Sequence, residues 1–229
     1  MNVDAIIDSL PLYVSGTWVT LQLLLVSCGI GLALAMPLAM LRSLPIAWLS
    51  WPIWLFTYVM RGTPMLVQLF LLYYGLAQFE AVRASPFWPW LSSPWFCAVT
   101  AFALNTCAYT TEILHGAMKA VPAGEIEAAK ALGMSRWVML RRIVLPSAFR
   151  RALPAYGNEV VLMLHGTALA SVVTLLDLTG AARQMNSNYY LPYEAFVTAA
   201  VFYAAITAVL VALFRAAEAR WLKPLLPRS

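Results

Sequence analysis

The chain has 229 residues, of which 62% are hydrophobic and 11% are charged, and its formal net charge at pH 7 is +5. Ordinary soluble domains contain about 45–50% apolar and about 25% charged residues, so this composition excludes a water-soluble globule and leaves no room for a separate soluble catalytic domain. Because the apolar excess runs through the whole chain, we expect one membrane-embedded unit.

Five apolar stretches approach the roughly 20 residues that a helix needs to cross a hydrocarbon core about 30 Å thick. We expect spans at Thr17–Leu41, Ile53–Leu76, Phe96–Leu114, Tyr156–Leu178 and Ala195–Phe214. Glycine and proline within the first span are tolerated in lipid, where neighbouring helices satisfy the backbone. The predicted fold class is an all-α integral membrane protein with five transmembrane helices, and an odd number of spans places the termini on opposite sides.

The basic residues gather on one side of the predicted membrane. Seven lie between the third and fourth spans, Arg42 lies between the first two, and Arg215, Arg220, Lys223 and Arg228 follow the fifth. Since short cytoplasmic loops are enriched in Lys and Arg, we expect a periplasmic N-terminus and a cytoplasmic C-terminus. Topology therefore accounts for the positive charge, and we expect no nucleic-acid partner.

The three cysteines point to packing rather than chemistry. Cys28, Cys97 and Cys107 lie inside apolar runs and show neither CxxC nor His-paired spacing, so we expect small buried side chains, no disulfide framework and no metal site.

Polar side chains within the spans are candidates for a substrate path, because an ionisable group at the bilayer centre costs about 2.5–3.5 kcal/mol on insertion scales. Arg61 opens the run Arg61-Gly62-Thr63-Pro64, which Gln68 follows. It marks either a kink at Pro64, with the arginine paired to a carboxylate or to carbonyls, or a contact with substrate.

Glu112 and Glu159 lie near the cytoplasmic ends of the third and fourth spans. Each either lines an aqueous path that favours a cationic substrate, or is paired with Arg61 or kept neutral by desolvation. The predicted path residues are Arg61, Thr63, Gln68, Glu112, Asn158 and Glu159. For His115 and His165 we expect hydrogen-bonded packing, and for Asn105, Thr106, Tyr109 and Thr110 hydrogen bonds between helices, with path lining as the alternative.

The segment from Lys119 to Arg151 is the one sizeable polar stretch, which predicts a soluble partner. Pro122 suits the start of a helix and Gly133 suits the left-handed residue that ends one, so we expect a short helix, a sharp turn and a second helix from about Ser135 to Val144. The ring of Pro146 is expected to stop that second helix before the fourth span.

This segment contains the run EAAKALGMSRWVMLRRIVLP, which resembles the signature of bacterial ABC importer permeases: Glu-Ala-Ala, three residues, Gly, nine residues, Ile, one residue, Leu-Pro. Every position of that pattern is filled here, by Glu127, Ala128, Ala129, Gly133, Ile143, Leu145 and Pro146. The resemblance implies the type-1 importer permease fold, with Glu127 to Gly133 forming a coupling helix that docks on a cytoplasmic ATPase.

The resemblance also implies the assembly and its location. It implies a second related permease chain in a heterodimer, two copies of the ATPase, a periplasmic amino-acid-binding protein, and residence in the bacterial inner membrane among lipid. The chain has no GxxxxGK[ST] phosphate loop, so no cofactor is expected in it and ATP with Mg would be bound by the ATPase. The implied organisation is a periplasmic segment 1–16, a type-1 transmembrane domain 17–214 with a cytoplasmic coupling segment 119–151, and a cytoplasmic tail 215–229.

Three further runs are similar to the polar amino acid permeases, and within them to the M-type subunit of the histidine and lysine/arginine/ornithine importer. They are PIWLFTYVMRGTP, LNTCAYTTEI and LPAYGNEVVLMLHGTALA. The expected function is therefore that of a permease subunit, not an enzyme, for histidine and basic L-amino acids, with another polar amino acid or an opine as the alternative. A membrane enzyme lacks any supporting motif, and a channel or membrane anchor is a third class.

Overall fold

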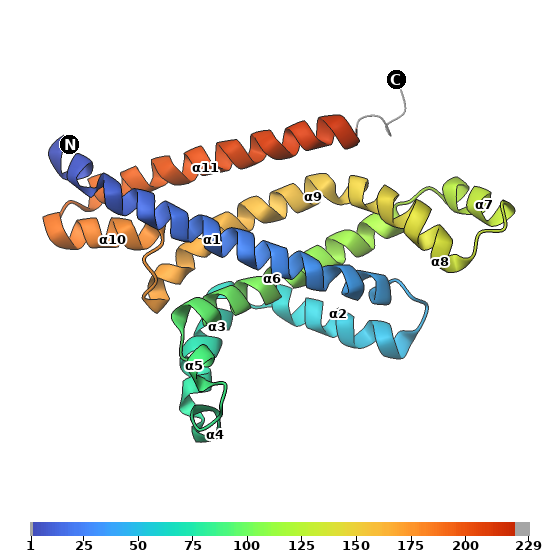
Figure 1. Cartoon of the computed structure of the whole chain (residues 1–229), viewed down its shortest axis with the longest axis horizontal. Helices are drawn as coiled ribbons and strands as arrows, with labels where there is room; N and C mark the ends of the chain where they lie inside the picture. The colour runs from blue at the N-terminus through green and yellow to red at the C-terminus, as the bar shows by residue number, and fades with distance from the viewer. Residues whose placement is uncertain (1, 223–229) are drawn as a thin grey trace.

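The structure is a computed structural model that describes residues 2–222, and these residues form helices and connecting turns without a β-strand. Four long helices run along one axis of an elongated bundle: α1 (Val3–Arg42), α6 (Pro94–Lys119), α9 (Leu145–Gly166) and α11 (Pro192–Trp221) (Figure 1). The N-terminus and α10 (Leu178–Tyr189) lie at one end of this axis, and α7 (Ala123–Ala131) and α8 (Arg136–Met139) lie at the other. Lys223 and Arg228, which contribute to the predicted orientation, lie outside the described residues.

Helix α1 begins well before the apolar stretch predicted to start at Thr17. The side chain of Asn2 caps it by accepting a hydrogen bond from the amide of Ala5, and Asp4 supplies a negative charge in the first turn. These are the residue types that start helices. At 1.5 Å per residue the 40 residues of α1 reach about 60 Å, roughly twice the thickness of a hydrocarbon core.

The predicted span Ile53–Leu76 is broken at Thr63-Pro64, the place where a kink was one of the two predicted alternatives. Helix α2 (Ala47–Gly62) ends before Thr63, whose φ of −112° and ψ of 142° are extended, and α3 (Met65–Phe70) starts after Pro64. A residue that precedes proline is driven out of the helical region, which explains the break. The helical segment Met65–Gln78 then runs at 103° to α2.

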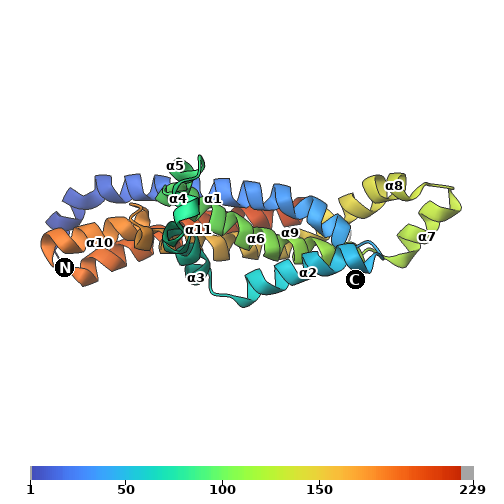
Figure 2. The ribbon, with the colours of Figure 1, turned by 90° about the horizontal axis from the view of Figure 1, so that it is seen from below.

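The helical segment Met65–Gln78 and the two short helices after it leave the bundle sideways. The segment continues from α3 through the π-helical turn η1 (Leu71–Gly75) and the 3₁₀ turn η2 (Leu76–Gln78), and the helices α4 (Glu80–Arg83) and α5 (Trp88–Leu91) come next. In Figure 1 the helices α3, α5 and α4 extend downward from the axis of the bundle, and in Figure 2, which is seen from below, they are drawn over its middle. The chain rejoins the bundle at α6.

Helix α6 is the centre of the fold and packs against α1, α2, α3 and α9. Among the described residues, only α1 and α11 are long and apolar enough to cross a membrane as single helices, and the two bent helix pairs raise the number to four. The predicted third span, Phe96–Leu114, is not among them. Neighbouring helices cover α6, so it carries polar side chains such as Asn105 and Thr110 at buried positions.

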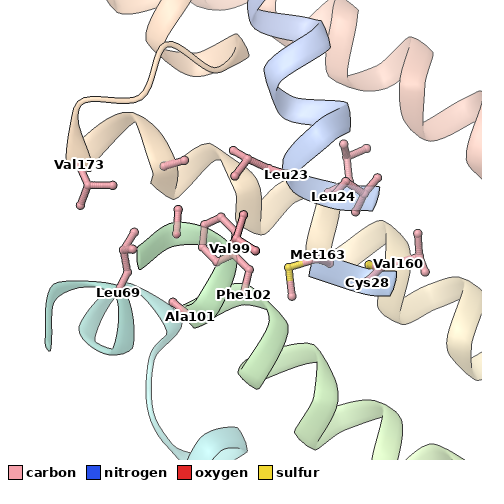
Figure 3. Packing of buried hydrophobic residues seen from close by; sticks show 13 residues of the cluster. Leu23, Leu24, Cys28, Leu69, Val99, Ala101, Phe102, Val160, Met163 and Val173 are labelled. Atoms are coloured by element: carbon pink, nitrogen blue, oxygen red, sulfur yellow. The ribbon is translucent and has the colours of Figure 1, made fainter. Parts of the chain in front are cut away.

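The core forms where α1, α6 and α9 cross. Leu23, Leu24 and Cys28 of α1 meet Phe102 of α6 and Met163 of α9, as Figure 3 shows. Such close packing is the main attraction between helices in lipid, where apolar surfaces gain nothing by avoiding water. The prediction that the cysteines are small buried side chains is confirmed for Cys28, Cys97 and Cys107.

The segment after α6 confirms the predicted turn and corrects one of its boundaries. Gly133 has a φ of +70° after α7, and Ser135 caps α8 by accepting from the amide of Val138. Pro146 does not stop the following helix: α8, the π-helical turn η3 (Leu140–Val144) and α9 run on without interruption. Pro146 lies in the first turn of α9, where a missing N–H is tolerated, so the helix continues through it.

The fourth predicted span, Tyr156–Leu178, ends earlier than expected. Helix α9 passes into the 3₁₀ helix η4 (Thr167–Val173), the chain turns at Thr174 with a φ of 69°, and α10 begins after Asp177. Both oxygens of the Asp177 carboxylate accept amide hydrogen bonds at the start of α10, from Thr179 and Gly180. Helix α10 was not expected from the sequence. Helix α11 contains the fifth predicted span, Ala195–Phe214, and extends past both of its ends.

Candidate functional site

A cavity of about 440 Å³ opens where the break between α2 and α3 faces α6 and α9. We call it the central cavity. Its lining residues come from all four helices and the break: Arg61, Gly62, Thr63, Pro64, Met65, Asn105, Tyr109, Glu159, Leu162 and Met163. Three of the six predicted path residues, Arg61, Thr63 and Glu159, therefore lie on one cavity.

Arg61 is held on one wall by an aromatic ring. Its guanidinium carbon lies 5.3 Å from the centre of the Tyr109 ring, and the Tyr109 hydroxyl makes a long hydrogen bond of 3.5 Å to the Arg61 carbonyl. A guanidinium over an aromatic face is attracted by the charge distribution of the ring. Within residues 2–222, Arg61 forms no ion pair with Glu159 or Glu112, so the pairing considered for these carboxylates is not present.

Glu159 is the acidic residue of the central cavity. It comes from α9, is only 5% exposed, and lies beside the apolar side chains of Leu162 and Met163 in the cavity wall. The cavity therefore presents a basic group on the α2 wall and an acidic group on the α9 wall without joining them to each other. Such a pair suits a ligand that carries both a negative and a positive charge.

Gln68 does not line the central cavity. Its side chain forms hydrogen bonds that stabilise the break between α2 and α3. Its side-chain nitrogen donates to the carbonyl of Met60 at 2.7 Å, and to the hydroxyl and carbonyl of Thr63 at 2.8 and 3.1 Å. Asn105 of α6 donates to the Gln68 oxygen at 3.0 Å. These bonds satisfy carbonyls that the broken helix leaves free, as non-helical backbone within a membrane requires.

The other two predicted path residues lie elsewhere. Glu112 pairs with Arg42 at 3.5 Å and accepts a hydrogen bond of 2.8 Å from Thr57, so it joins the ends of α1, α2 and α6. Asn158 is exposed on α9 and is not among the residues that line the central cavity. His115 and His165 have hydrogen-bond contacts with Ser43 at 2.8 Å and Thr207 at 3.4 Å.

Several lining residues were not among the predicted path residues. Asn105 and Tyr109 lie four residues apart and so share one face of α6; both also form the predicted hydrogen bonds between helices, to Gln68 and to the Arg61 carbonyl. Their spacing was the available signal. Met163 lies four residues after Glu159 and so shares its helix face, which was a further signal, whereas Met65 carried none. The side chain of Met65 packs on Gly166, where a β-carbon would meet its methyl group.

The Glu-Ala-Ala segment, Glu127 to Gly133, lies at the end of the bundle where α7 and α8 are found, and most of its residues are exposed. Glu127 and Ala128 are exposed on its surface, whereas Ala129 is buried at 2% exposure. Of the remaining motif positions, Ile143 and Leu145 are partly buried, and Pro146 is exposed. An ion pair of 3.6 Å between Glu125 and Arg151 ties α7 to α9, so α7 is attached to a helix that lines the central cavity.

Residues 28–223 match the family model described as "Binding-protein-dependent transport system inner membrane component". The chain is 51% identical to the "Histidine/lysine/arginine/ornithine transport system permease protein HisM" of Escherichia coli (strain K12), over 94% of this chain and 91% of the relative. It is 44% identical to the "Nopaline transport system permease protein NocM" of Agrobacterium fabrum, over 98% of this chain and 93% of that relative.

A solved structure has the same fold. The structure described as "Crystal structure of an amino acid ABC transporter with histidines" aligns with a TM-score of 0.86 at 32% identity and covers 96% of this chain and 99% of that chain. The all-helical arrangement of this chain is thus the fold of an ABC importer permease.

Proposed function

The chain belongs to the family of binding-protein-dependent transport system inner membrane components, and we propose that it is the permease subunit of an ATP-driven importer of histidine and basic L-amino acids. The 51% identity to a histidine/lysine/arginine/ornithine permease over nearly the whole chain carries this proposal. Relatives of this kind are inner-membrane permeases and not enzymes, so ATP with Mg is assigned to separate ATPase subunits.

The proposed topology has five spans, a periplasmic N-terminus and a cytoplasmic C-terminus, with a transmembrane domain over 17–214. The central, partly polar α6 counts as one span and the α2–α3 pair as another that is broken. This orientation places α7 and α8 in the cytoplasm, where the basic residues of 119–151 follow the positive-inside rule. Since so few helices enclose only part of a path, the proposed assembly contains a second related permease chain, two ATPases and a periplasmic binding protein.

The proposed coupling contact is the exposed surface of the Glu-Ala-Ala segment. A rigid α7, joined to α9 through the pair Glu125–Arg151, transmits closure of the ATPases to one wall of the central cavity. Glu127→Ala and Gly133→Val are expected to abolish ATP-driven uptake in the assembled complex while the chain still inserts. Gly116→Ala is the control, because a β-carbon there meets nothing within 4 Å. Uptake at the wild-type rate in both variants would contradict the coupling role.

The proposed substrate contacts are the two charges of the central cavity. Arg61 would bind the carboxylate of an amino acid, since a guanidinium matches carboxylate geometry. Glu159 would bind the cationic side chain. Thr63 and Asn105 add polar groups to the lining. Two of the remaining predicted path residues act indirectly in this proposal: Gln68 stabilises the break, and Glu112 holds the ends of three helices together.

Uptake by proteoliposomes containing the assembled complex tests this selectivity. Histidine, arginine, lysine, ornithine, glutamine and glutamate are compared for the wild type and Glu159→Gln. A hydrogen bond to a charged group contributes about 1.5–3 kcal/mol, so the variant is expected to lose about ten- to hundredfold of the preference for arginine over glutamine. A wild-type preference for glutamate, or an unchanged preference in the variant, would contradict the role of Glu159.

An opine is the second candidate substrate, favoured by the 44% identity to a nopaline permease over 98% of this chain. Opines carry more than one carboxylate beside a cationic group, so they also present both charges to the central cavity. Adding nopaline and octopine to the same uptake panel separates the candidates. Faster uptake of either opine than of arginine would favour the second.

A further inference from the structure

A groove of about 810 Å³ lies between the end of α1 and the segment α8–η3. We call it the interfacial groove. Met40, Leu41 and Leu44 form one wall, and Trp137, Leu140 and Val144 form the other. Lys130 and Arg136 also line it and are both exposed.

The position of this groove indicates what surrounds it. The apolar stretch of α1 ends at Leu41, so this end of α1 leaves the hydrocarbon core beside the groove. Trp137 is 63% exposed and Leu44 is 42% exposed, although both line the groove. Exposed tryptophan and apolar side chains beside a helix end are typical of the layer where lipid headgroups meet the acyl chains.

Both charged side chains that line the groove are basic. Within the described residues, neither Lys130 nor Arg136 forms an ion pair, and of the two acidic residues of the segment 119–151, Glu125 is paired with Arg151 and Glu127 does not line the groove. The segment from Lys119 to Arg151 that forms one wall carries seven basic and two acidic residues. An occupant with an apolar body and a negative end therefore satisfies both parts of the lining.

We propose that the interfacial groove binds one anionic phospholipid of the adjoining leaflet, with its acyl chains along α1 and its phosphate between Lys130 and Arg136. Basic pockets between membrane helices bind anionic headgroups by the same combination of forces. A lipid in this place bridges α1 to the segment after α7. The proposal goes beyond transport of amino acids. It requires that α1 crosses the membrane and that Lys130, which lies within the segment proposed to contact the ATPase, faces the groove and not that contact.

Photocrosslinking identifies the occupant without altering the charges. A benzophenone amino acid replaces Met139, another groove-lining residue, in the assembled complex within membranes of phosphatidylglycerol and phosphatidylethanolamine. The expected adduct is a phosphatidylglycerol. A crosslink to a peptide of the ATPase or of either permease chain, or the absence of a lipid adduct, would overturn the proposal.

Native mass spectrometry of the delipidated complex then measures the selectivity. Lys130→Gln with Arg136→Gln is expected to weaken retention of phosphatidylglycerol at least tenfold. Arg141→Gln with Arg142→Gln is the matched control, because both arginines are exposed on the same segment and neither lines the groove. The wild type should retain phosphatidylglycerol better than phosphatidylcholine, and glycerol 1-phosphate should not displace it.

Equal retention in the two double variants, or equal retention of the two lipids by the wild type, would overturn the anionic site. Displacement by glycerol 1-phosphate would overturn the requirement for acyl chains. Amino acid uptake is measured in the same preparations, so a failure of lipid binding is distinguished from a failure of the proposed transport function.

Discussion

Replacing Gly16 by alanine tests the packing that holds the N-terminal half of α1 in place. A β-carbon at this position would lie 2.8 Å from the carbonyl oxygen of Asp177, 3.0 Å from its carbonyl carbon and 3.1 Å from the α-carbon of Leu178. All three are backbone atoms at the start of α10, so no side-chain rotation relieves the contact. The two helices must move apart.

The expected change in the free energy of unfolding is worked out by comparing Gly16→Ala with a matched substitution, Gly29→Ala, on the same helix. At Gly29 a β-carbon meets nothing within 4 Å, so Gly29→Ala gains only the advantage of alanine over glycine within a helix, about 0.5–1 kcal/mol. Gly16→Ala gains the same amount but also overpacks a close contact, which costs about 1–3 kcal/mol. The two variants should therefore differ by about 1–3 kcal/mol.

Thermal unfolding of the purified chain in detergent measures this difference. For 150–250 residues, 1 kcal/mol corresponds to about 2–4 °C, so Gly16→Ala should unfold about 2–12 °C below Gly29→Ala. Equal unfolding temperatures for the two variants would refute the close approach of α1 to α10. A Gly16→Ala variant more stable than the wild type would refute it as well.

Substitutions at three other positions probe the polar contacts by the same thermal assay. Asp177→Ala removes a helix cap and should cost about 1–2 kcal/mol, whereas Asp177→Asn keeps an acceptor for one of the two amides and should lose less; equal losses would exclude a capping role. Gln68→Leu leaves the Thr63 carbonyl without its partner and should cost about 1–3 kcal/mol and slow uptake, and an unchanged protein would refute its support of the break. Glu112→Gln keeps an acceptor but loses the partly exposed pair with Arg42, so we expect about 1 kcal/mol or less, and a larger loss would show a stronger pair.

Local chemistry explains what could be predicted at the break and in the coupling segment. The Thr63-Pro64 pair predicts a disruption of the helix because the proline ring restricts the backbone of the residue before it. Gly133 predicts a left-handed turn because glycine lacks a β-carbon. The same reasoning was wrong for Pro146, which was predicted to stop the helix and does not. Its effect depends on its position relative to the first turn of α9, and the π-helical turn that precedes it was not visible in the sequence.

The central cavity was only partly accessible to such reasoning. Arg61 and Glu159 stand out because charged groups are expensive within a membrane, and both line the cavity. Glu112 stands out for the same reason yet faces Arg42, which comes from a distant part of the chain. Because burying a charge is costly, a buried carboxylate is expected to have a partner. Which residue is that partner depends on which helices the fold brings together.

The sequence by itself indicated that this chain is a membrane protein and which family it belongs to, and it predicts that the segment 119–151 meets a soluble partner. These properties depend on composition and on short motifs, and a residue and its near neighbours along the chain carry them. Only the tertiary structure decided the 103° bend that opens the central cavity, the place of Tyr109 under Arg61 and the contact of α1 with α10. Each of those depends on residues from different helices, whose meeting is set by packing across the whole bundle and leaves no mark in local periodicity.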